Sequence, residues 1–566
     1  MLVLGLALGT LSPVVAQEGT PGSDLDEPPF SLPFADPPGP TTWLYEQHYG
    51  NTTAAFNYGD VWYEFGQGLH FGIDFEAPCG TPVLAIADGV VAYVDAEGFG
   101  AGPHNLVLDH PGTGYASLYG HLLQQPALIR GQTATRGQQI GLSGDPDGSC
   151  GSRPHLHLEI REEGYQVALN PVPFFDVNWH MIASIGPFTN GFQQDLDAPY
   201  RWMKLDDQPD VHFSANFLNN YSHPWPPRIE LRAPVNPPVD RRLDPLPDEV
   251  TVSRAAVALD QWSLGAWWDA RDPDAVYLID AVPDQDAGVF RQPLDGSPRR
   301  YVQPAPPPLV SPDGSVTVEY VGGGNMRIVR RLTGETWDVF TNGNYPAVSP
   351  DGTRLLWEVV HGNYLPGSTL PGVAMWISNL DGTQRRQVYT QAGGYSQWLD
   401  SHRLLIVKRP PYTAETQLYI LDVDDPRVQP ELLGIYRFLH GLKIAPGGGM
   451  IAFYMPFQED AAQSGVYVQL TEIGTSPRQL DVFGAYEWRD NRSLYVLSFD
   501  AAQDAAQGAH ALGVVDSQSG DHRWLTDPDD LPIRVANGDW SVSPDGTRLV
   551  YVDPTDYGLY VLTVGE

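Results

Sequence analysis

The sequence predicts a mostly β protein with two parts, an antiparallel β-sheet domain and a C-terminal β-propeller of about six to seven blades. Two observations carry this prediction. Short β-type runs, such as residues 82–87, 89–94 and 105–109, are separated by Gly, Pro and Asp, which are typical of turns. After residue 250, a Ser-Pro-Asp-Gly turn recurs, and a hydrophobic strand follows it each time.

The composition limits the number of domains and the classes of partner that we expect. The chain has 566 residues, enough for several domains that each bury a core. Its 33 basic and 69 acidic residues give a net charge of −36, so the chain lacks the clustered positive charge that nucleic acid or an anionic membrane surface requires. Two cysteines are too few for a disulfide scaffold. We therefore expect no nucleic-acid partner.

The N-terminus has the features of an export signal. Residues 1–16 form a short apolar segment with small side chains at its end, and we interpret them as a signal peptide. The charged region that usually begins such a signal is missing, and the alternative is a disordered apolar tail. No apolar run reaches the roughly 18 residues of a membrane-spanning helix, so we expect no membrane span.

Proline-rich stretches divide the chain. Proline is excluded from helix and sheet interiors, so such stretches favour extended linkers. The predicted divisions are a Pro-rich linker at 17–40, the β domain at 41–175, a connecting subdomain and second Pro-rich linker at 176–250, and the propeller at 251–566.

The repeat after residue 250 predicts the propeller. Clear copies begin at Ser311, Ser349 and Ser543. Weaker copies begin near Ala270, Leu399, Ala445 and Arg489. The resulting spacing of about 40 to 54 residues is the size of one four-stranded blade. The alternative is an ordinary β-rich domain with common turns. The turn and strand together resemble those of TolB-type, WD-like propellers, a resemblance that does not identify a ligand; a protein or a glycan remains open.

Two histidine patterns predict a metal site in the β domain. In the first, His70 and Asp74 are four residues apart, so their side chains share one face of a strand or a helix. In the second, residues 154–160 alternate strictly, which places His155, His157 and Glu159 on one face of a strand. A hydrolytic zinc ion takes three protein ligands and keeps one open position.

We therefore expect one zinc ion bound by His70, Asp74 and either His155 or His157, with the remaining histidine available for proton transfer. His121, in a strand-like aromatic stretch, is a further candidate for that role. Each pattern alone is common in structural positions, and only their conjunction favours a metal site. No His-Glu-x-x-His motif occurs, which excludes the helical zincin arrangement.

Residues 66–161 resemble the lysostaphin-type or LytM-type zinc metalloendopeptidases, which cut peptide bonds in bacterial peptidoglycan. The resemblance rests on His70-Phe-Gly-Ile-Asp74, Ala77-Pro-Cys-Gly-Thr-Pro-Val83, Tyr119-Gly-His121-Leu, Arg136-Gly-Gln-Gln-Ile-Gly141 and Pro154-His-Leu-His-Leu-Glu159. It implies that His70, Asp74 and His157 bind zinc, and that His121 and His155 form the catalytic pair.

The resemblance also implies a function. We expect a zinc-dependent endopeptidase, with one zinc ion per chain, that is secreted or held in the cell envelope of a bacterium and acts on peptidoglycan peptides. The propeller would serve interaction or substrate targeting. The alternative is a non-catalytic wall-binding or hydrolase-activator protein that keeps the peptidase fold, although all five site positions are occupied.

The two cysteines lie close in sequence to the expected zinc-site residues. Cys79 lies five residues after Asp74, and Cys150 lies five before His155. If both segments converge on one zinc ion, a disulfide between them becomes plausible in a secreted chain; the alternative of cysteine as a zinc ligand is disfavoured because the His and Asp set is complete. Glu159 is either an orienter of a ligand or a solvated strand residue, and the sequence favours the solvated position.

Overall fold

The structure is a computed structural model. It describes residues 27–52, 55, 69–99, 104–146, 148, 150–186, 193–195, 201–213, 240–259, 261, 263–283, 285–364, 371–411, 413–425, 427, 429–499 and 508–565. The predicted signal peptide at 1–16 lies outside these residues, as do 17–26 and 214–239 of the two Pro-rich stretches. Among the helices that the structure describes, none has the length and apolar character needed to cross a membrane.

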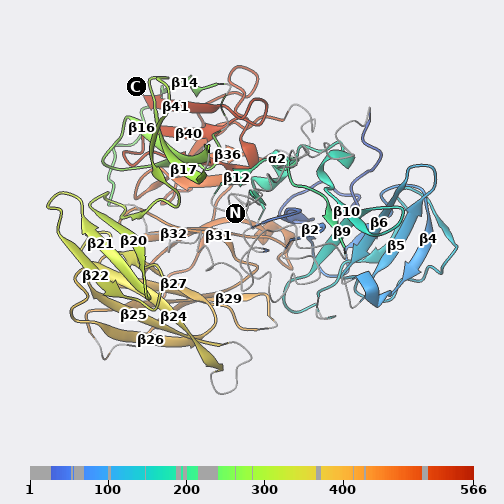
Figure 1. Ribbon diagram of the computed structural model, residues 1–566, viewed down its shortest axis with the longest axis horizontal. Helices are drawn as coiled ribbons and strands as arrows, with labels where there is room; N and C mark the ends of the chain where they lie inside the picture. Colours follow the sequence, from blue (N-terminus) through green and yellow to red (C-terminus); the bar gives the residue numbers. More distant parts are fainter. Residues whose placement is uncertain are drawn as a thin grey trace, which may run out of the picture.

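An antiparallel sheet forms the N-terminal domain (Figure 1). Its strands lie in the order β1-β2-β9-β6-β5-β4-β7, and β10 and β13 extend it beside β9. In that order the bounds are Leu44–Gln47, Ile73–Glu76, His155–Glu162, Tyr115–Gly120, Leu106–His110, Gly89–Val94 and Thr133–Ala134, with β10 at Val167–Leu169 and β13 at Val211–His212. A separate pair joins β3 (Pro82–Leu84) to β8 (Gln139–Leu142). The predicted antiparallel β domain is confirmed.

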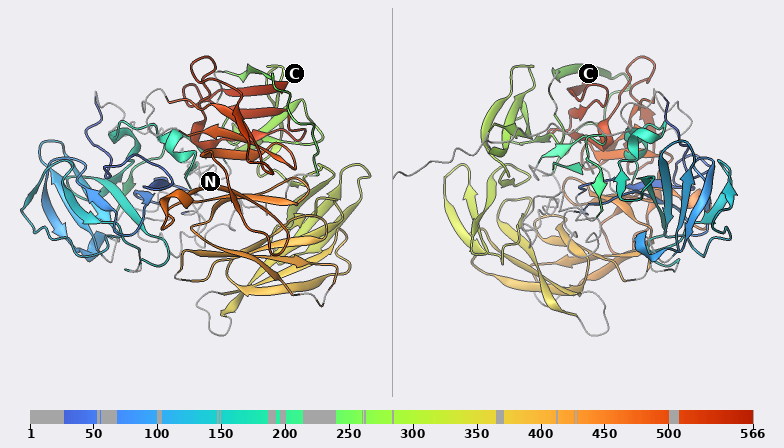
Figure 2. Two further views of the ribbon diagram at one scale, coloured as in Figure 1. Left: turned by 180° about the vertical axis from the view of Figure 1, so that it is seen from behind. Right: turned by 45° about the vertical axis from the view of Figure 1, so that its right-hand side comes forward.

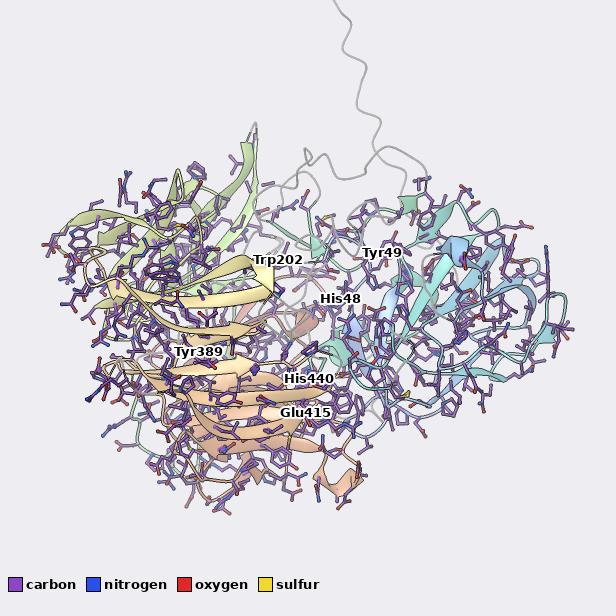
Figure 3. The ribbon with its side chains drawn as sticks, turned by 90° about the horizontal axis from the view of Figure 1, so that it is seen from below. His48, Tyr49, Trp202, Tyr389, Glu415 and His440 are labelled. Carbon is purple, nitrogen blue, oxygen red and sulfur yellow. A yellow bond between two sulfur atoms is a disulfide. The ribbon has the colours of Figure 1, made fainter. Side chains whose placement is uncertain are left out.

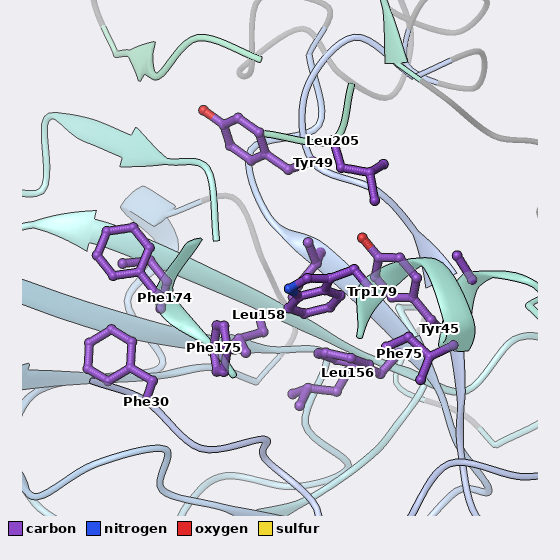
Figure 4. Close-up of a cluster of buried hydrophobic side chains, with 14 of the residues drawn as sticks. Phe30, Tyr45, Tyr49, Phe75, Leu156, Leu158, Phe174, Phe175, Trp179 and Leu205 are labelled. Atoms are coloured by element: carbon purple, nitrogen blue, oxygen red, sulfur yellow. The ribbon is translucent and has the colours of Figure 1, made fainter. Parts of the chain in front are cut away.

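Strict alternation along β9 divides its residues between two environments. Leu156, Leu158 and Ile160 are fully buried in the hydrophobic core. Figure 4 shows Leu156 beside Phe75, and Leu158 between Phe175 and Trp179, the latter from helix α2 (Trp179–Ala183). The opposite face of β9 is thereby left for polar side chains.

Residues 27–40, in the stretch predicted to be a Pro-rich linker, pack onto the N-terminal domain. Phe30 is only 4% exposed, and its ring packs against those of Phe174 and Phe175. Phe34 stacks on Trp43. The prolines keep this segment extended, but its aromatic side chains belong to the core of the N-terminal domain.

Seven four-stranded antiparallel sheets form the propeller within the described part of the chain (Figures 1 and 2). The first six are β15–β18, β19–β22, β23–β26, β27–β30, β31–β34 and β35–β38, each in chain order. The seventh has the order β14-β41-β40-β39, so the first strand of the propeller completes its last blade. The predicted propeller is confirmed, and its blade number is seven.

The bounds of the propeller strands are as follows: β14 Thr251–Ala258, β15 Trp267–Trp268, β16 Ala275–Val282, β17 Gln285–Pro293, β18 Arg300–Pro304, β19 Leu309–Val310, β20 Val316–Gly322, β21 Asn325–Arg330, β22 Thr336–Phe340, β23 Ala347–Val348, β24 Arg354–Tyr364, β25 Pro371–Asn379, β26 Arg386–Ala392, β27 Tyr395–Trp398, β28 Arg403–Lys408, β29 Glu415–Asp422, β30 Glu431–Arg437, β31 His440–Ile444, β32 Met450–Met455, β33 Gly465–Leu470, β34 Arg478–Gln479, β35 Gly484–Trp488, β36 Ser493–Ser498, β37 Leu512–Asp516, β38 His522–Trp524, β39 Trp540–Val542, β40 Arg548–Val552 and β41 Leu559–Gly565.

Outside these sheets, the described residues include β11 (Gln193–Gln194) paired with β12 (Trp202–Met203), and short 3₁₀ turns at Glu97–Phe99, Val172–Phe174, Ala461–Gln463 and Ala536–Gly538.

Each repeated turn joins the first and second strands of a blade. In the turn at Ser311, the Ser311 hydroxyl donates to Asp313 Oδ1 at 2.6 Å and accepts from the backbone N–H of Val316 at 2.9 Å. The Ser349 turn repeats this pattern with Asp351, and the Ser543 turn repeats it with Asp545. The turn is therefore a closed local hydrogen-bond unit, which explains its recurrence.

The N-terminal domain packs directly on the propeller (Figure 2). Leu44 of β1 and Ile185 lie in one hydrophobic cluster with propeller residues that include Tyr454 and Trp488. His440 Nε2 lies 3.0 Å from Glu76 Oε1 of β2, and Figure 3 shows His440 and His48 near this boundary. The two parts therefore share a continuous core.

The end of the second Pro-rich stretch also packs on the propeller. Arg241 is only 9% exposed and donates to the carbonyls of Trp488, Ser543 and Pro544. Leu246 and Val250 contact the core of the last blades. Residues 240–250, the end of the predicted Pro-rich linker, are thus anchored to the propeller.

Candidate metal centre

Neighbouring strands bring the two predicted histidine patterns together. In the antiparallel pair of β2 and β9, Asp74 lies opposite His157 and Glu76 lies opposite His155. Directly opposite residues in such a pair project from the same face. On the other side of β9, His157 faces Gly120 of β6, which has no side chain to fill the space above it.

Three side-chain atoms converge at this point. His70 Nε2 lies 3.2 Å from His157 Nδ1 and 3.3 Å from Asp74 Oδ1, and His157 Nδ1 lies 2.8 Å from the same Asp74 oxygen. Tetrahedral zinc with ligands at about 2.0–2.1 Å requires ligand atoms about 3.3 Å apart. The spacing and the donor set of two imidazoles and one carboxylate therefore fit one such ion.

In both His70 and His157, the ring nitrogen that faces away from the centre makes a hydrogen bond that orients the ring. His70 Nδ1 donates to the His48 carbonyl at 2.7 Å, which leaves Nε2 to face the centre. His157 Nε2 lies 3.0 Å from Glu159 Oε1, which leaves Nδ1 to face it. Gly72, midway between His70 and Asp74, is required here, because a Cβ at this position would lie 2.7 Å from the His157 ring.

Glu159 is not a solvated strand residue, so that expectation is wrong. Its exposed fraction is 0%, and its carboxylate also accepts from Arg161. Burial alone would raise the pKa of Glu159, but Arg161 and His157 outweigh it, so the pKa lies below its usual value. Glu159 is therefore an ionised, buried partner of His157.

The remaining two predicted histidines lie beside this group. The His121 ring centroid is 4.8 Å from that of His155 and 5.8 Å from that of His157. His121 directly follows β6 and has a φ of +56°, a left-handed backbone conformation that is uncommon outside glycine. All five predicted site residues thus lie together, while their individual roles stay a prediction.

Sequence reasoning missed Glu46. A register shift between Tyr45 and Gln47 interrupts the pairing of β1 with β2 at this residue. The Glu46 carboxylate consequently lies 3.9 Å from His155 Nδ1, and Glu46, Asp74 and His155 form a second group with ligand atoms within 4.8 Å of one another. The available signal was an acidic residue directly after the apolar stretch from Trp43 to Tyr45.

The two loops that flank the centre are joined covalently. Cys79 follows β2, Cys150 precedes β9, and the structure contains a disulfide between them with a Cα–Cα distance of 5.6 Å. The predicted disulfide is confirmed, and cysteine as a metal ligand is excluded for both residues.

We expect the double variant Cys79→Ser/Cys150→Ser to melt at a lower temperature than the wild type. The bridge spans a sequence separation of 71 residues, and losing such a cross-link costs about 4 kcal/mol of unfolding free energy on the chain-entropy scale. Calorimetry of the full chain measures the effect. Equal melting temperatures for variant and wild type would contradict it.

The part of the chain that carries this site matches a known protein family. Residues 68–171 match the family model described as Peptidase family M23. The chain contains an M23 peptidase domain. The match covers all five predicted site residues and the strands from β2 to β10. The predicted resemblance to the lysostaphin-type peptidases is confirmed.

Curated relatives match the M23 domain over a limited length. An uncharacterized metalloprotease of Haemophilus influenzae Rd is 42% identical over 104 residues, which are 18% of this chain and 20% of the relative. The peptidoglycan DD-endopeptidase ShyA of Vibrio cholerae O1 is 36% identical over 116 residues, 20% of this chain and 24% of that protein. This chain thus spans about a quarter or less of the length of these relatives.

Among solved structures, the catalytic domain of lysostaphin from Staphylococcus simulans is 30% identical. The match covers 19% of this chain and 79% of that domain, with a TM-score of 0.17.

The pKa of His157 in the M23 domain predicts how metal affinity depends on pH. Burial disfavours the charged imidazole, but hydrogen bonds with Asp74 and Glu159 outweigh this and raise the pKa to about 9. Metal binding must displace this proton. Below pH 9, raising the pH removes the competing proton, so apparent zinc affinity should rise about tenfold per pH unit between pH 7 and 8.5. Chelator competition at several pH values measures this slope, and a flat profile would contradict it.

Proposed function

We propose that this protein is a zinc-dependent endopeptidase that hydrolyses peptide bonds of bacterial cell-wall peptidoglycan, and that it acts outside the cytoplasm or in the cell envelope. The convergence of His70 Nε2, Asp74 Oδ1 and His157 Nδ1 within 2.8 to 3.3 Å, inside an M23 domain, carries this proposal. The peptidoglycan endopeptidase activity in the name of the Vibrio cholerae relative supports the substrate class.

The three converging residues would hold the zinc ion. When bound, zinc supplies Lewis-acid chemistry, which polarises the scissile carbonyl and acidifies water. Asp74 is suited to this role because it is ionised at neutral pH. Burial alone would raise the pKa of Asp74, but the surrounding histidines outweigh this effect and hold the pKa well below its usual value.

His155 is placed to accept a proton. Its Nδ1 donates to the Arg153 carbonyl at 2.9 Å, so Nε2 carries the lone pair and faces the centre, 3.8 Å from Asp74 Oδ2. Burial holds the pKa of His155 well below its usual value, which keeps the ring neutral at pH 7. A neutral imidazole at this position can take a proton from the attacking water and return it to the leaving amine.

His121, directly after β6, lies beside His155. With its ring beside that of His155, it would donate a hydrogen bond to the charge that develops on the substrate carbonyl. The retention of both histidines beside a complete ligand set favours an enzyme over a non-catalytic wall-binding protein.

Digestion of purified peptidoglycan by the full chain tests the proposal. We expect new amino termini and a mass shift in the muropeptides that identifies the bond cut, and we expect chelation to abolish both. Protein that carries zinc but releases no new amino termini would contradict the enzymatic function and support the wall-binding alternative.

A further inference from the structure

A buried chain of side chains lies behind His157. Glu159, two residues along the same face of β9, accepts a hydrogen bond from His157 Nε2 at 3.0 Å. Arg161, two residues further, donates its Nε to the other Glu159 oxygen. Both residues are at least nine-tenths buried, so this ion pair is shielded from water and strongly oriented.

Two aromatic rings clamp the guanidinium of Arg161. Its Cζ lies 4.8 Å from the ring centroid of Phe99 and 4.5 Å from that of Phe213. A cation held between two rings has little freedom to rotate, and the contact is favourable in itself. The orientation of Arg161, and through it that of Glu159, therefore depends on these two phenylalanines.

Phe213 reaches His157 by a second route as well. Its ring meets that of Phe71 edge-on, with centroids 5.4 Å apart, and Phe71 in turn meets the His157 ring edge-on at 5.7 Å. Phe213 follows directly after β13, whose pairing with β10 attaches it to the sheet. It lies beyond residue 171, where the match to the M23 family ends.

We propose that Glu159, Arg161 and Phe213 are positioning residues that fix the His157 ring with Nδ1 toward the metal, and that the segment ending at Phe213 is thereby part of the metal centre. This inference rests on the proposed zinc site. It assigns a role to the connecting segment, for which the sequence predicted none. Metal-ligating histidines commonly donate their other N–H to a carboxylate, and loss of such a partner weakens metal binding by about 10- to 100-fold.

The variants must separate positioning from folding. Glu159→Gln alone would leave Arg161 charged and unpaired in the core, which destabilises the domain. The double variant Glu159→Gln/Arg161→Met removes the buried charges together. Phe213→Leu keeps apolar bulk but loses the ring face, and Phe213→Tyr restores it. Glu163→Gln, at an exposed position just after β9, is the matched control.

Zinc affinity of the full chain is measured by competition with a chromophoric chelator, and the visible spectrum of the Co²⁺-loaded protein reports ligand geometry. We expect the double variant to bind zinc about 10- to 100-fold more weakly and to show an altered Co²⁺ spectrum. We expect Phe213→Leu to change both in the same direction. Phe213→Tyr and Glu163→Gln should match the wild type.

The outcomes separate the two proposals. Wild-type zinc affinity and Co²⁺ spectrum in both the double variant and Phe213→Leu would overturn the positioning role. Phe213→Leu alone decides the matter if the double variant fails to fold. A wild-type protein that binds no metal would instead overturn the zinc site on which this inference rests.

Discussion

Replacing Asp74 by alanine should abolish both zinc binding and peptidoglycan hydrolysis. Asp74 provides one of the three converging ligand atoms, and its carboxylate also contacts both His70 and His157. Its loss removes the negative charge that the cation requires in this buried site. We expect metal content to fall from about one zinc ion per chain to almost none, and kcat/KM to fall at least about 10³-fold.

Elemental analysis of dialysed protein and release of new amino termini provide the two measurements. Asp176→Ala is the matched control, because Asp176 is an exposed carboxylate of the same region. Full zinc retention in Asp74→Ala would remove Asp74 from the ligand set.

Replacing His155 by alanine should lower kcat while zinc remains bound. In the proposed site His70, Asp74 and His157 are the ligands and His155 lies beside them, so its loss should remove a proton acceptor and leave the proposed metal ligands intact. General acid–base groups typically contribute about 10²- to 10⁴-fold, and we expect kcat to fall within this range. Steady-state kinetics on a defined muropeptide, together with metal analysis, measures the effect.

His402→Ala is a suitable control, since His402 is an exposed propeller histidine paired with Asp424. If His155→Ala loses its zinc, His155 is a ligand, and the roles of His155 and His157 must be exchanged. If it keeps both zinc and full activity, another group moves the proton.

The sequence predicts best those features that depend on local chemistry. The alternation from His155 to Ile160 determines by itself which side chains share a face, and the structure has this pattern. The propeller turns could be predicted from the sequence equally well. In each, a serine, an aspartate and the next strand form their hydrogen bonds within a few residues, so the repeat is visible without knowledge of the rest of the fold.

Features that depend on distant partners could not be predicted. Glu159 is buried because Arg161 neutralises it, and Arg161 is held in turn by Phe99 and Phe213, which lie far away in sequence. Phe30 is in the core because it meets Phe174. Proline content correctly indicates extended chain in such segments, but it does not show whether the side chains between the prolines find a core.

The closing blade determines when the propeller can finish folding. Thr251 pairs with Gly565 and Arg254 with Leu562, so the first strand of the ring finds its neighbour in β41, the last strand of the propeller. Until then β14 has an open hydrogen-bonding edge, which is a hazard for aggregation. Pairing across such a sequence separation is slow. Completion of the ring must therefore wait until β41 has been synthesised, and protection of that edge until then is a requirement that the architecture itself imposes.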